Sequence, residues 1–201
     1  PDQAMGMAGM VFYTLLLALM ADFALFACHY LFHRVWFLWE LHKVHHSAEV
    51  MNPLTAFRFH PIEDLVNVTT VALCVGVVKS AFLWWYGADP ISWKIMGLDG
   101  VVFVFYLLAY NLRHSHIWLP YPQRVSHMLI SPAQHQIHHS IARKHWNKNL
   151  GFTFAFWDWA AGTLYVPKER EKLTYGLGTG EDHAYHSPIG IYIRPIASII
   201  H

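Results

Sequence analysis

Histidine spacing constrains this 201-residue chain more than any other feature. Half of its 16 histidines form one HxxxH motif and two HxxHH motifs. Residues three and four apart lie on one face of a helix, so each motif would present its imidazole rings together. Neutral imidazole is the commonest protein metal ligand, and three such motifs in one chain predict a metal site. The motif residues are His29 and His33, then His42, His45 and His46, and then His135, His138 and His139.

Composition favours a membrane protein. Hydrophobic residues make up 55% of the chain, and its mean hydropathy of +0.26 is high for a soluble domain. The net charge is only +1 and no extended Lys/Arg run is present, so nucleic acid is not an expected partner. Cys28 and Cys74 lie in apolar stretches without a CxxC pair, and we expect them to be small core residues. The chain begins at Pro1 without a methionine, which leaves room for an upstream targeting segment or apolar helix.

Apolar stretches predict an all-α integral membrane bundle. About 20 apolar residues suffice to cross a bilayer as a helix. Membrane helices are predicted at about 5–32, 65–87 and 95–112, in a bundle of about three to four such helices. A hairpin of the second and third helices would return the chain to the histidine side, where His114 and His116 precede Pro120. Segments 33–64 and 113–201 are predicted to form a helical cap outside the membrane that carries the histidine motifs.

Two further polar residues allow more than one interpretation. Asp22 is costly in hydrocarbon, and it lies seven residues before His29 on nearly the same helical stripe. It is either a buried carboxylate bonded to a neighbouring helix or a support for the histidine site. His60 stands alone before a proline. It is a candidate metal ligand, a hydrogen-bond donor to a ligand or an interfacial residue.

The number of motif histidines selects among the kinds of site they can form. Surface histidines and a tag-like artefact are poor explanations, because all three motifs fall on one predicted side of the membrane. A structural zinc site usually closes with four ligands and favours cysteine, and haem needs only one or two axial ligands. Two metal ions, each bound by several imidazoles with room for an exogenous ligand, fit the count best.

The chemistry of the predicted ligands then limits which reactions the site could perform. Imidazole suits iron, copper, zinc and nickel alike, so the histidines alone do not choose the metal. The Glu-x-x-His motifs of soluble di-iron bundles are absent, which predicts a site of nearly all nitrogen ligands. Iron with open positions could bind and reduce dioxygen and oxidise an unactivated carbon. At the mouth of a membrane bundle, a lipid is the natural substrate.

At these residues the sequence resembles the fatty acid hydroxylase and sterol desaturase superfamily. The family pattern HxxxH, HxxHH, HxxHH is met in order, and flanking stretches such as TAFRFHPIE, SPAQHQIHHS, NLGF and WDWAAGT also match over roughly residues 15–178. The resemblance implies that the eight motif histidines are metal ligands and that His114 is an additional one. His116 stands where relatives often carry asparagine, which leaves open whether His114, His116 or both complete the ligand set. Asn149 and Asp158 are implied to be supporting residues.

The resemblance also implies an activity and its cofactors. Members are integral membrane di-iron oxygenases that hydroxylate or desaturate fatty acyl chains, sterols or ether lipids. The whole chain, 1–201, is then expected to be a single fatty acid hydroxylase-like membrane domain with two iron ions and O2 as co-substrate. Electrons would come from a partner such as cytochrome b5 or ferredoxin, or from a pterin in one branch. No haem-binding or flavin-binding segment is visible in the sequence.

Two other functions remain open from the sequence. The histidines could serve a membrane metal-binding or metal-transport protein that passes zinc or copper, although transporters need ionisable residues along their spans. The second alternative is a purely structural protein whose fold is held together by zinc. Orientation follows from the positive-inside rule, which places the histidine side in the cytoplasm, in a bacterial inner membrane or the endoplasmic reticulum. The cations on that side are Arg34, Lys43, Arg58, Arg143, Lys144 and Lys148.

Overall fold

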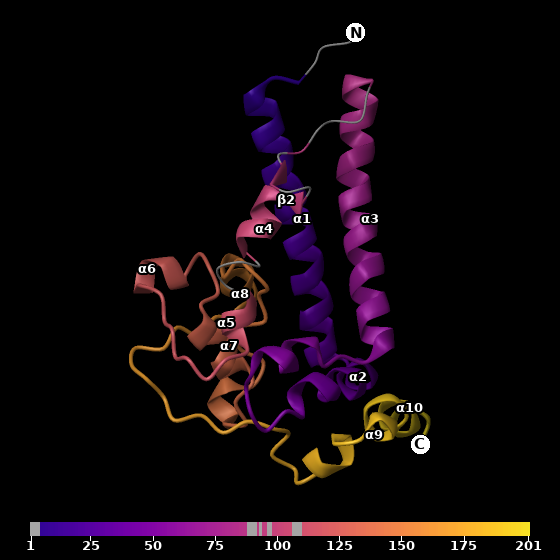
Figure 1. Cartoon of the computed structure of the whole chain (residues 1–201), viewed down its shortest axis with the longest axis vertical. Helices are drawn as coiled ribbons and strands as arrows, with labels where there is room; N and C mark the ends of the chain where they lie inside the picture. The colour runs from indigo at the N-terminus through magenta and orange to yellow at the C-terminus, as the bar shows by residue number, and fades with distance from the viewer. Residues whose placement is uncertain (1–4, 88–91, 93, 96–97, 106–109) are drawn as a thin grey trace.

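Two long helices dominate the computed structural model, which describes residues 5–87, 92, 94–95, 98–105 and 110–201. Helix α1 (Met7–Arg34) and helix α3 (Pro61–Tyr86) run side by side and rise above the rest of the chain (Figure 1). Both are long and apolar enough to cross a membrane. In the most apolar part of α3, only 6% of residues are buried inside the protein, whereas a core helix of a soluble protein would be covered.

Local sequence sets the ends of α3. Pro61 occupies the first turn, where its missing N–H costs nothing, and the ring of His60 accepts a hydrogen bond from the Ile62 amide at 3.2 Å. Asp64 places negative charge at the positive end of the helix dipole. The helix ends at Gly87, whose φ of 72° is the left-handed conformation that glycine adopts readily.

The predicted all-α membrane bundle is confirmed, but the third apolar stretch differs from the continuous helix expected at 95–112. Strands β1 (Lys94–Ile95) and β2 (Leu98–Asp99) form a short antiparallel pair, and helix α4 (Gly100–Phe105) follows. Residues 96–97 and 106–109 of the expected helix lie outside the described residues. In the described residues the helix therefore begins at Gly100, five residues later than expected.

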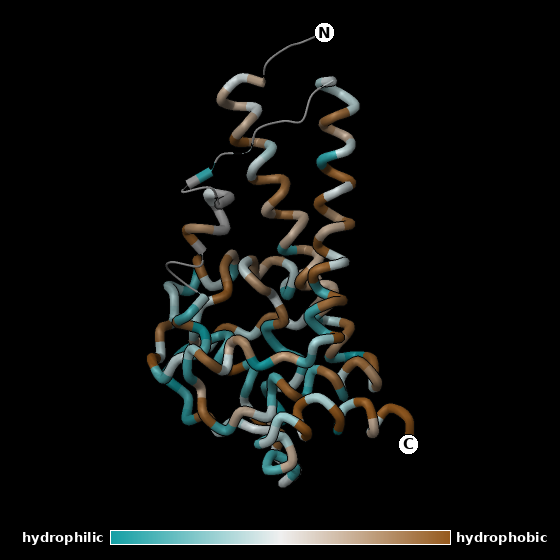
Figure 2. The backbone as a smooth tube through the Cα atoms, turned by 45° about the vertical axis from the view of Figure 1, so that its right-hand side comes forward, coloured by the Kyte–Doolittle hydropathy of each residue, from teal (hydrophilic) through white to brown (hydrophobic). Residues whose placement is uncertain are grey.

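A cap of short elements covers one end of the two long helices (Figure 1). Figure 2 shows that hydrophilic residues concentrate in this cap, whereas the long helices are largely apolar. Helix α2 (Trp36–His46) follows α1 after the extended residue Val35. The other cap elements are η1 (Pro53–Phe57), α5 (Asn111–Arg113), α6 (Gln123–Ser126), α7 (Pro132–His138), η3 (Arg143–His145), α8 (Phe156–Ala161), η4 (Asp182–Tyr185), α9 (Pro188–Tyr192) and α10 (Arg194–Ile200).

Candidate metal centre

Nine histidines converge in two adjacent groups where α1, α2, α5 and α7 meet. Within each group the nearest ring nitrogens lie within 4.8 Å of one another. The five-histidine group contains His29, His33, His42, His46 and His138. The four-histidine group contains His45, His114, His135 and His139.

Helical geometry explains how each HxxHH motif serves both groups. In α2, His42 and His46 are four residues apart and point to the five-histidine group, whereas His45 lies on the adjoining face and joins the other group. At α7 the division is reversed. There the four-residue pair His135 and His139 joins the four-histidine group, and His138 joins the five-histidine group.

Helix α7 is fixed in place by its own capping residues. Ser131 Oγ accepts a hydrogen bond from the Gln134 amide at 3.2 Å, and Gln134 Oε1 accepts one from the Ser131 amide at 2.9 Å. This reciprocal pair satisfies two backbone N–H groups that the start of a helix leaves free. Pro132 adds a fixed φ in the first turn. A helix of only seven residues can therefore hold buried histidines in register.

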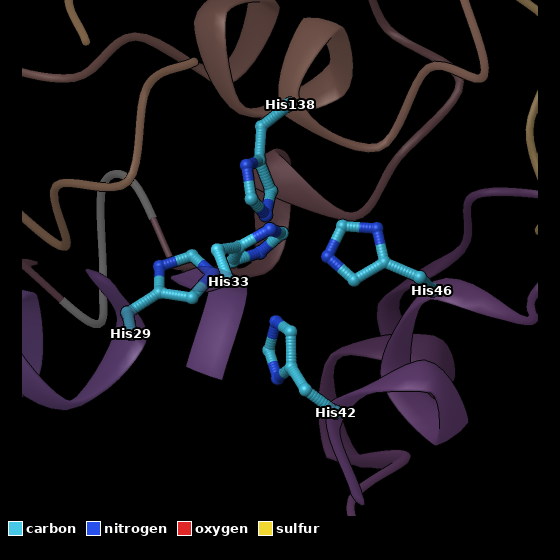
Figure 3. A group of neighbouring side chains, drawn as sticks. All are labelled: His29, His33, His42, His46 and His138. Atoms are coloured by element: carbon cyan, nitrogen blue, oxygen red, sulfur yellow. The ribbon is translucent and has the colours of Figure 1, made fainter. Parts of the chain in front are cut away.

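In the five-histidine group, all five Nε2 atoms point inward. Figure 3 shows the rings directed towards a common centre. Each Nε2 is buried, and none has a hydrogen-bond partner in the part of the chain that the structure describes. A buried nitrogen without a partner normally costs about 1–3 kcal/mol. Five of them around one point are explained most simply by a metal ion that accepts their lone pairs.

The opposite ring nitrogens are held by fixed acceptors. The Nδ1 atoms of His29 and His138 donate to the carbonyl oxygens of Leu150 at 2.7 Å and Lys148 at 3.0 Å. Because a carbonyl can only accept, the proton must sit on Nδ1. His42 Nδ1 lies 2.7 Å from the Glu63 carboxylate in α3. These contacts leave the Nε2 lone pairs free, as in metal sites where a carboxylate or carbonyl orients a ligating histidine.

The four-histidine group brings ring nitrogens still closer. His135 Nε2 lies 2.8 Å from His114 Nε2 and 3.2 Å from His139 Nε2. Lone pairs at such distances repel unless a proton or a cation lies between them. Ligands about 2.0–2.1 Å from one metal ion are themselves about 3 Å apart, which matches this spacing. His114 Nδ1 is held 3.0 Å from Thr55 Oγ1 of η1.

The two groups form one centre. The ring centroids of His46 and His139, which belong to different groups, are 4.5 Å apart. The ring centroids of His42 and His45, which also belong to different groups, are 5.4 Å apart. The donor set therefore fits two neighbouring metal ions. Among the described residues no carboxylate enters either group, as the absence of Glu-x-x-His motifs predicts.

Burial favours the neutral form of the converging histidines in α2, in α7 and at the end of α5. It lowers the pKa of His42, His45 and His46 well below the usual value, and neighbouring imidazoles lower each pKa further. The same two causes act on the pKa of His135, His138 and His139. The pKa of His114 falls to about 3, first through burial and then through the charge of Arg113. Neutral imidazole is the form that binds metal.

Asp22, the first of three predicted supporting residues, bonds the part of the cap that contains Thr153, Phe154 and Trp157. Asp22 accepts hydrogen bonds from the Thr153 and Phe154 amides at 2.7 and 3.2 Å and from Trp157 Nε1 at 3.0 Å, which attaches α1 to the cap. Asp22 is thus a buried, fully bonded carboxylate outside both histidine groups.

Asn149 and Asp158 support the same segment. Asn149 donates to the carbonyl of Gln134 in α7 at 3.0 Å and accepts from the Tyr165 amide at 2.7 Å. Asp158 accepts from the amides of Leu150 and Gly151 at 2.7 and 2.6 Å. Burial raises the pKa of Asp158, and these hydrogen bonds oppose that rise. Both residues thus bond to or lie within the segment whose carbonyls bond His29 and His138.

His60 and His116 lie outside both histidine groups. His60 caps α3, and its Nε2 donates to the carbonyl of Tyr192 at 3.1 Å, so its role is to join α3 to the C-terminal helices. His116 is exposed and lines a separate surface cavity. Of the two histidines that follow the third apolar stretch, the structure brings only His114 to the centre.

Sequence reasoning missed the groups that orient the ligands. The sequence motifs do not single out Glu63, although a carboxylate in the first turn of α3 is a recognisable signal for such a role. Thr55 has a weaker signal, because its hydroxyl lies in an ordinary capped turn. The carbonyls of Lys148 and Leu150 have none, since every residue carries one.

Cavities reach the centre from two directions. A cavity of about 540 Å³ runs along α1 and α3 and is lined largely by alanine, valine and phenylalanine side chains. It shares Leu25, Phe59, Asn67, Tyr110 and Phe152 with a smaller cavity of about 80 Å³, which touches histidines of both groups. A third cavity, of about 290 Å³, lies against His33, His46, His138 and His139 and is lined by α2 and loops of the cap.

Comparison with known proteins agrees with this architecture. The chain is 26% identical over 171 residues to the ornithine lipid hydroxylase OlsE of Rhizobium tropici, a match that covers 84% of this chain and 46% of that protein. It is 26% identical over 161 residues to the alkylglycerol monooxygenase of Caenorhabditis elegans, covering 80% of this chain and 28% of the relative. The chain thus spans less than half the length of these relatives. No solved structure matches it.

The family match covers most of α1, all of α3 and all three histidine motifs. Residues 14–163 match the family described as fatty acid hydroxylase. That range includes each of the nine converging histidines. Together with the two apolar helices, the match supports an integral membrane protein. The chain belongs to the fatty acid hydroxylase family.

Proposed function

We propose that residues 1–201 form a single membrane domain that holds two iron ions and oxidises a C–H bond of a lipid with O2. The observation that carries this proposal is the convergence of nine imidazoles, seven of them buried, in two adjacent groups, with the five buried Nε2 atoms of one group free of partners in the described residues. We assign all nine histidines as metal ligands. His60 and His116 are not included, because neither lies in a group.

The chain's own residues would perform distinct tasks. The five-histidine and four-histidine groups would each hold one iron, and Glu63, Thr55 and the carbonyls of Lys148 and Leu150 would keep the rings oriented. Bound iron supplies the chemistry that activates dioxygen to oxidise an unactivated carbon. Burial of the ligands excludes water from the reacting region. The reducing electrons must come from an external donor, either a protein of the cytochrome b5 or ferredoxin type or a pterin.

A lipid fits the apolar cavity along α1 and α3. The cavity connects the membrane-facing helices with the histidines through shared lining residues, so an acyl chain or ring could enter from the bilayer. The two named relatives, a lipid hydroxylase and an alkylglycerol monooxygenase, favour insertion of oxygen over formation of an alkene. We therefore place hydroxylation ahead of desaturation. The excess of Lys and Arg on the histidine side supports a cytoplasmic site, in a bacterial inner membrane or the endoplasmic reticulum.

Lipid mass spectrometry of host cells tests the activity. Cells that express the chain, within its full-length protein if it is part of one, should accumulate a lipid that has gained sixteen mass units. His45→Ala and His138→Ala should abolish that product, because each removes a ligand from one group. His116→Ala is the matched control and should retain it. A product that persists in both ligand variants would refute the proposal. Zinc uptake into vesicles without oxygen or reductant would support the transport alternative instead.

A further inference from the structure

The C-terminal helices expose apolar side chains that no described part of the protein covers. Residues Pro188–Ile200 form a short apolar helical segment at the end of the cap, too short to span a bilayer. Ile189, Ile193 and Ile200 are 73%, 60% and 73% exposed. Figure 1 shows α9 and α10 lying below the lower end of α3.

The opposite part of α10 is packed on the membrane helices. Ile196 and Ile199 contact a buried cluster formed by Cys28 and Phe32 of α1 and Leu41 of α2. Val66 of α3 belongs to the same contact region. His60 at the start of α3 also bonds the Tyr192 carbonyl, which fixes the junction of α9 and α10. The orientation of the segment is therefore set by the protein.

Helical geometry divides α10 into three faces. At about 100° per residue, Ile196 and Ile199 define the face that packs on the protein, and Ile193, Ala197 and Ile200 form an exposed apolar stripe beside it. The polar residues Arg194, Ser198 and His201 lie on the remaining side. An exposed apolar stripe next to a polar side is typical of a helix that lies in a membrane surface.

The start of α3 adjoins the same segment. His60 caps α3 and bonds the Tyr192 carbonyl, so the junction of α9 and α10 lies at the cap end of that helix. Leu65, in the second turn of α3, is an exposed apolar residue near this end of the helix. Interfacial helices bury their apolar face about 5–10 Å into the boundary between headgroups and acyl chains.

We propose that α9 and α10 lie in the plane of the membrane surface, with Ile193, Ala197 and Ile200 in contact with lipid. Because α10 packs on α2, which carries His42, His45 and His46, this contact would hold the histidine-bearing helix at a fixed depth. The occupant of the exposed stripe is thus the bilayer from which the two long helices emerge. This inference does not depend on the metal or on the reaction.

Spin labels test which environment each face meets. The full chain carrying Cys74→Ala would be reconstituted in phosphatidylcholine vesicles, and single cysteines would be placed at 193, 197 or 200, or at 198 or 201 as controls on the same helix. All five positions are exposed, so no variant removes a buried contact. Cys28 is buried, and the unsubstituted background measures any labelling there. Power saturation then compares collisions with oxygen, which partitions into lipid, and with a water-soluble nickel complex.

The expected result separates the two faces. Labels at 193, 197 and 200 should collide with oxygen and be protected from nickel, whereas labels at 198 and 201 should show the reverse. Nickel access at all five positions would overturn the proposal. Protection of 193, 197 and 200 from both reagents would also overturn it, because a second protein surface, such as another copy of the chain, would then cover the stripe.

Discussion

Individual side chains decide which nitrogen of each histidine faces the centre. Glu63 lies 2.7 Å from His42 Nδ1, and the carbonyl of Leu150 lies 2.7 Å from His29 Nδ1. The motif spacing predicted the ligand residues, because helical periodicity places residues three and four apart on one face. It could not predict ring orientation, which depends on acceptors from distant segments such as α3.

Removal of the Glu63 carboxylate should weaken the centre without unfolding the chain. We expect Glu63→Ala to lower iron affinity by roughly 10–100-fold, since loss of a group that orients a ligand typically has that effect. Asp64→Ala is the matched control, because Asp64 lies in the same turn but is exposed. Iron retained during competition with a chelator measures the effect. Equal retention by Glu63→Ala and the wild type would show that His42 needs no such partner.

The metal-free chain should lose stability as the pH falls. Burial lowers the folded-state pKa of the cap histidines below the unfolded value of 6.5, and for His114 to about 3. The unfolded state therefore binds more protons below pH 6.5, so the stability that these groups contribute is present above that pH and is lost as the pH falls towards the folded pKa values. The Tm of chelator-treated protein should drop between pH 7 and pH 5. A constant or rising Tm over that interval would contradict the neutral, buried state of these rings.

At the scale of elements, a single connecting segment holds ligands from two helices. Residues 148–151, between η3 and α8, provide the carbonyls that bond His138 of α7 and His29 of α1. Asp158 of α8 fixes this segment through the Leu150 and Gly151 amides. The resemblance to the family indicated that Asp158 is a supporting residue, but the path from it to His29 required the fold.

Substitution of Asp158 should therefore affect both stability and metal binding. In Asp158→Asn an amide NH2 group must face a backbone N–H, which leaves a buried donor unsatisfied at a cost of about 1–3 kcal/mol. Glu169→Gln removes the same charge at an exposed position and is the control. Thermal unfolding together with iron content gives the readout. An Asp158→Asn protein with unchanged Tm and full iron would show that the segment is fixed by other contacts.

At the scale of the whole molecule, the architecture separates an apolar region from a polar cap that holds the histidines. Hydropathy predicted the two long helices to within a few residues, at 5–32 against Met7–Arg34 and at 65–87 against Pro61–Tyr86. The start of α3 was placed too late, because charged residues in a first turn resemble a loop when only apolar runs are counted. The third helix was predicted to begin too early, because hydropathy does not distinguish the strand pair of residues 94–95 and 98–99 from an apolar helix.

The most direct test of the central claim is the ratio of iron to chain in the aerobically purified protein. Two neighbouring groups of imidazoles predict about two iron ions per chain. His138→Ala and His45→Ala, one from each group, should lower that ratio, and His116→Ala should leave it at the wild-type value. A folded wild-type protein that binds no more than one metal ion, or ligand variants that retain two, would contradict a centre built from these nine histidines.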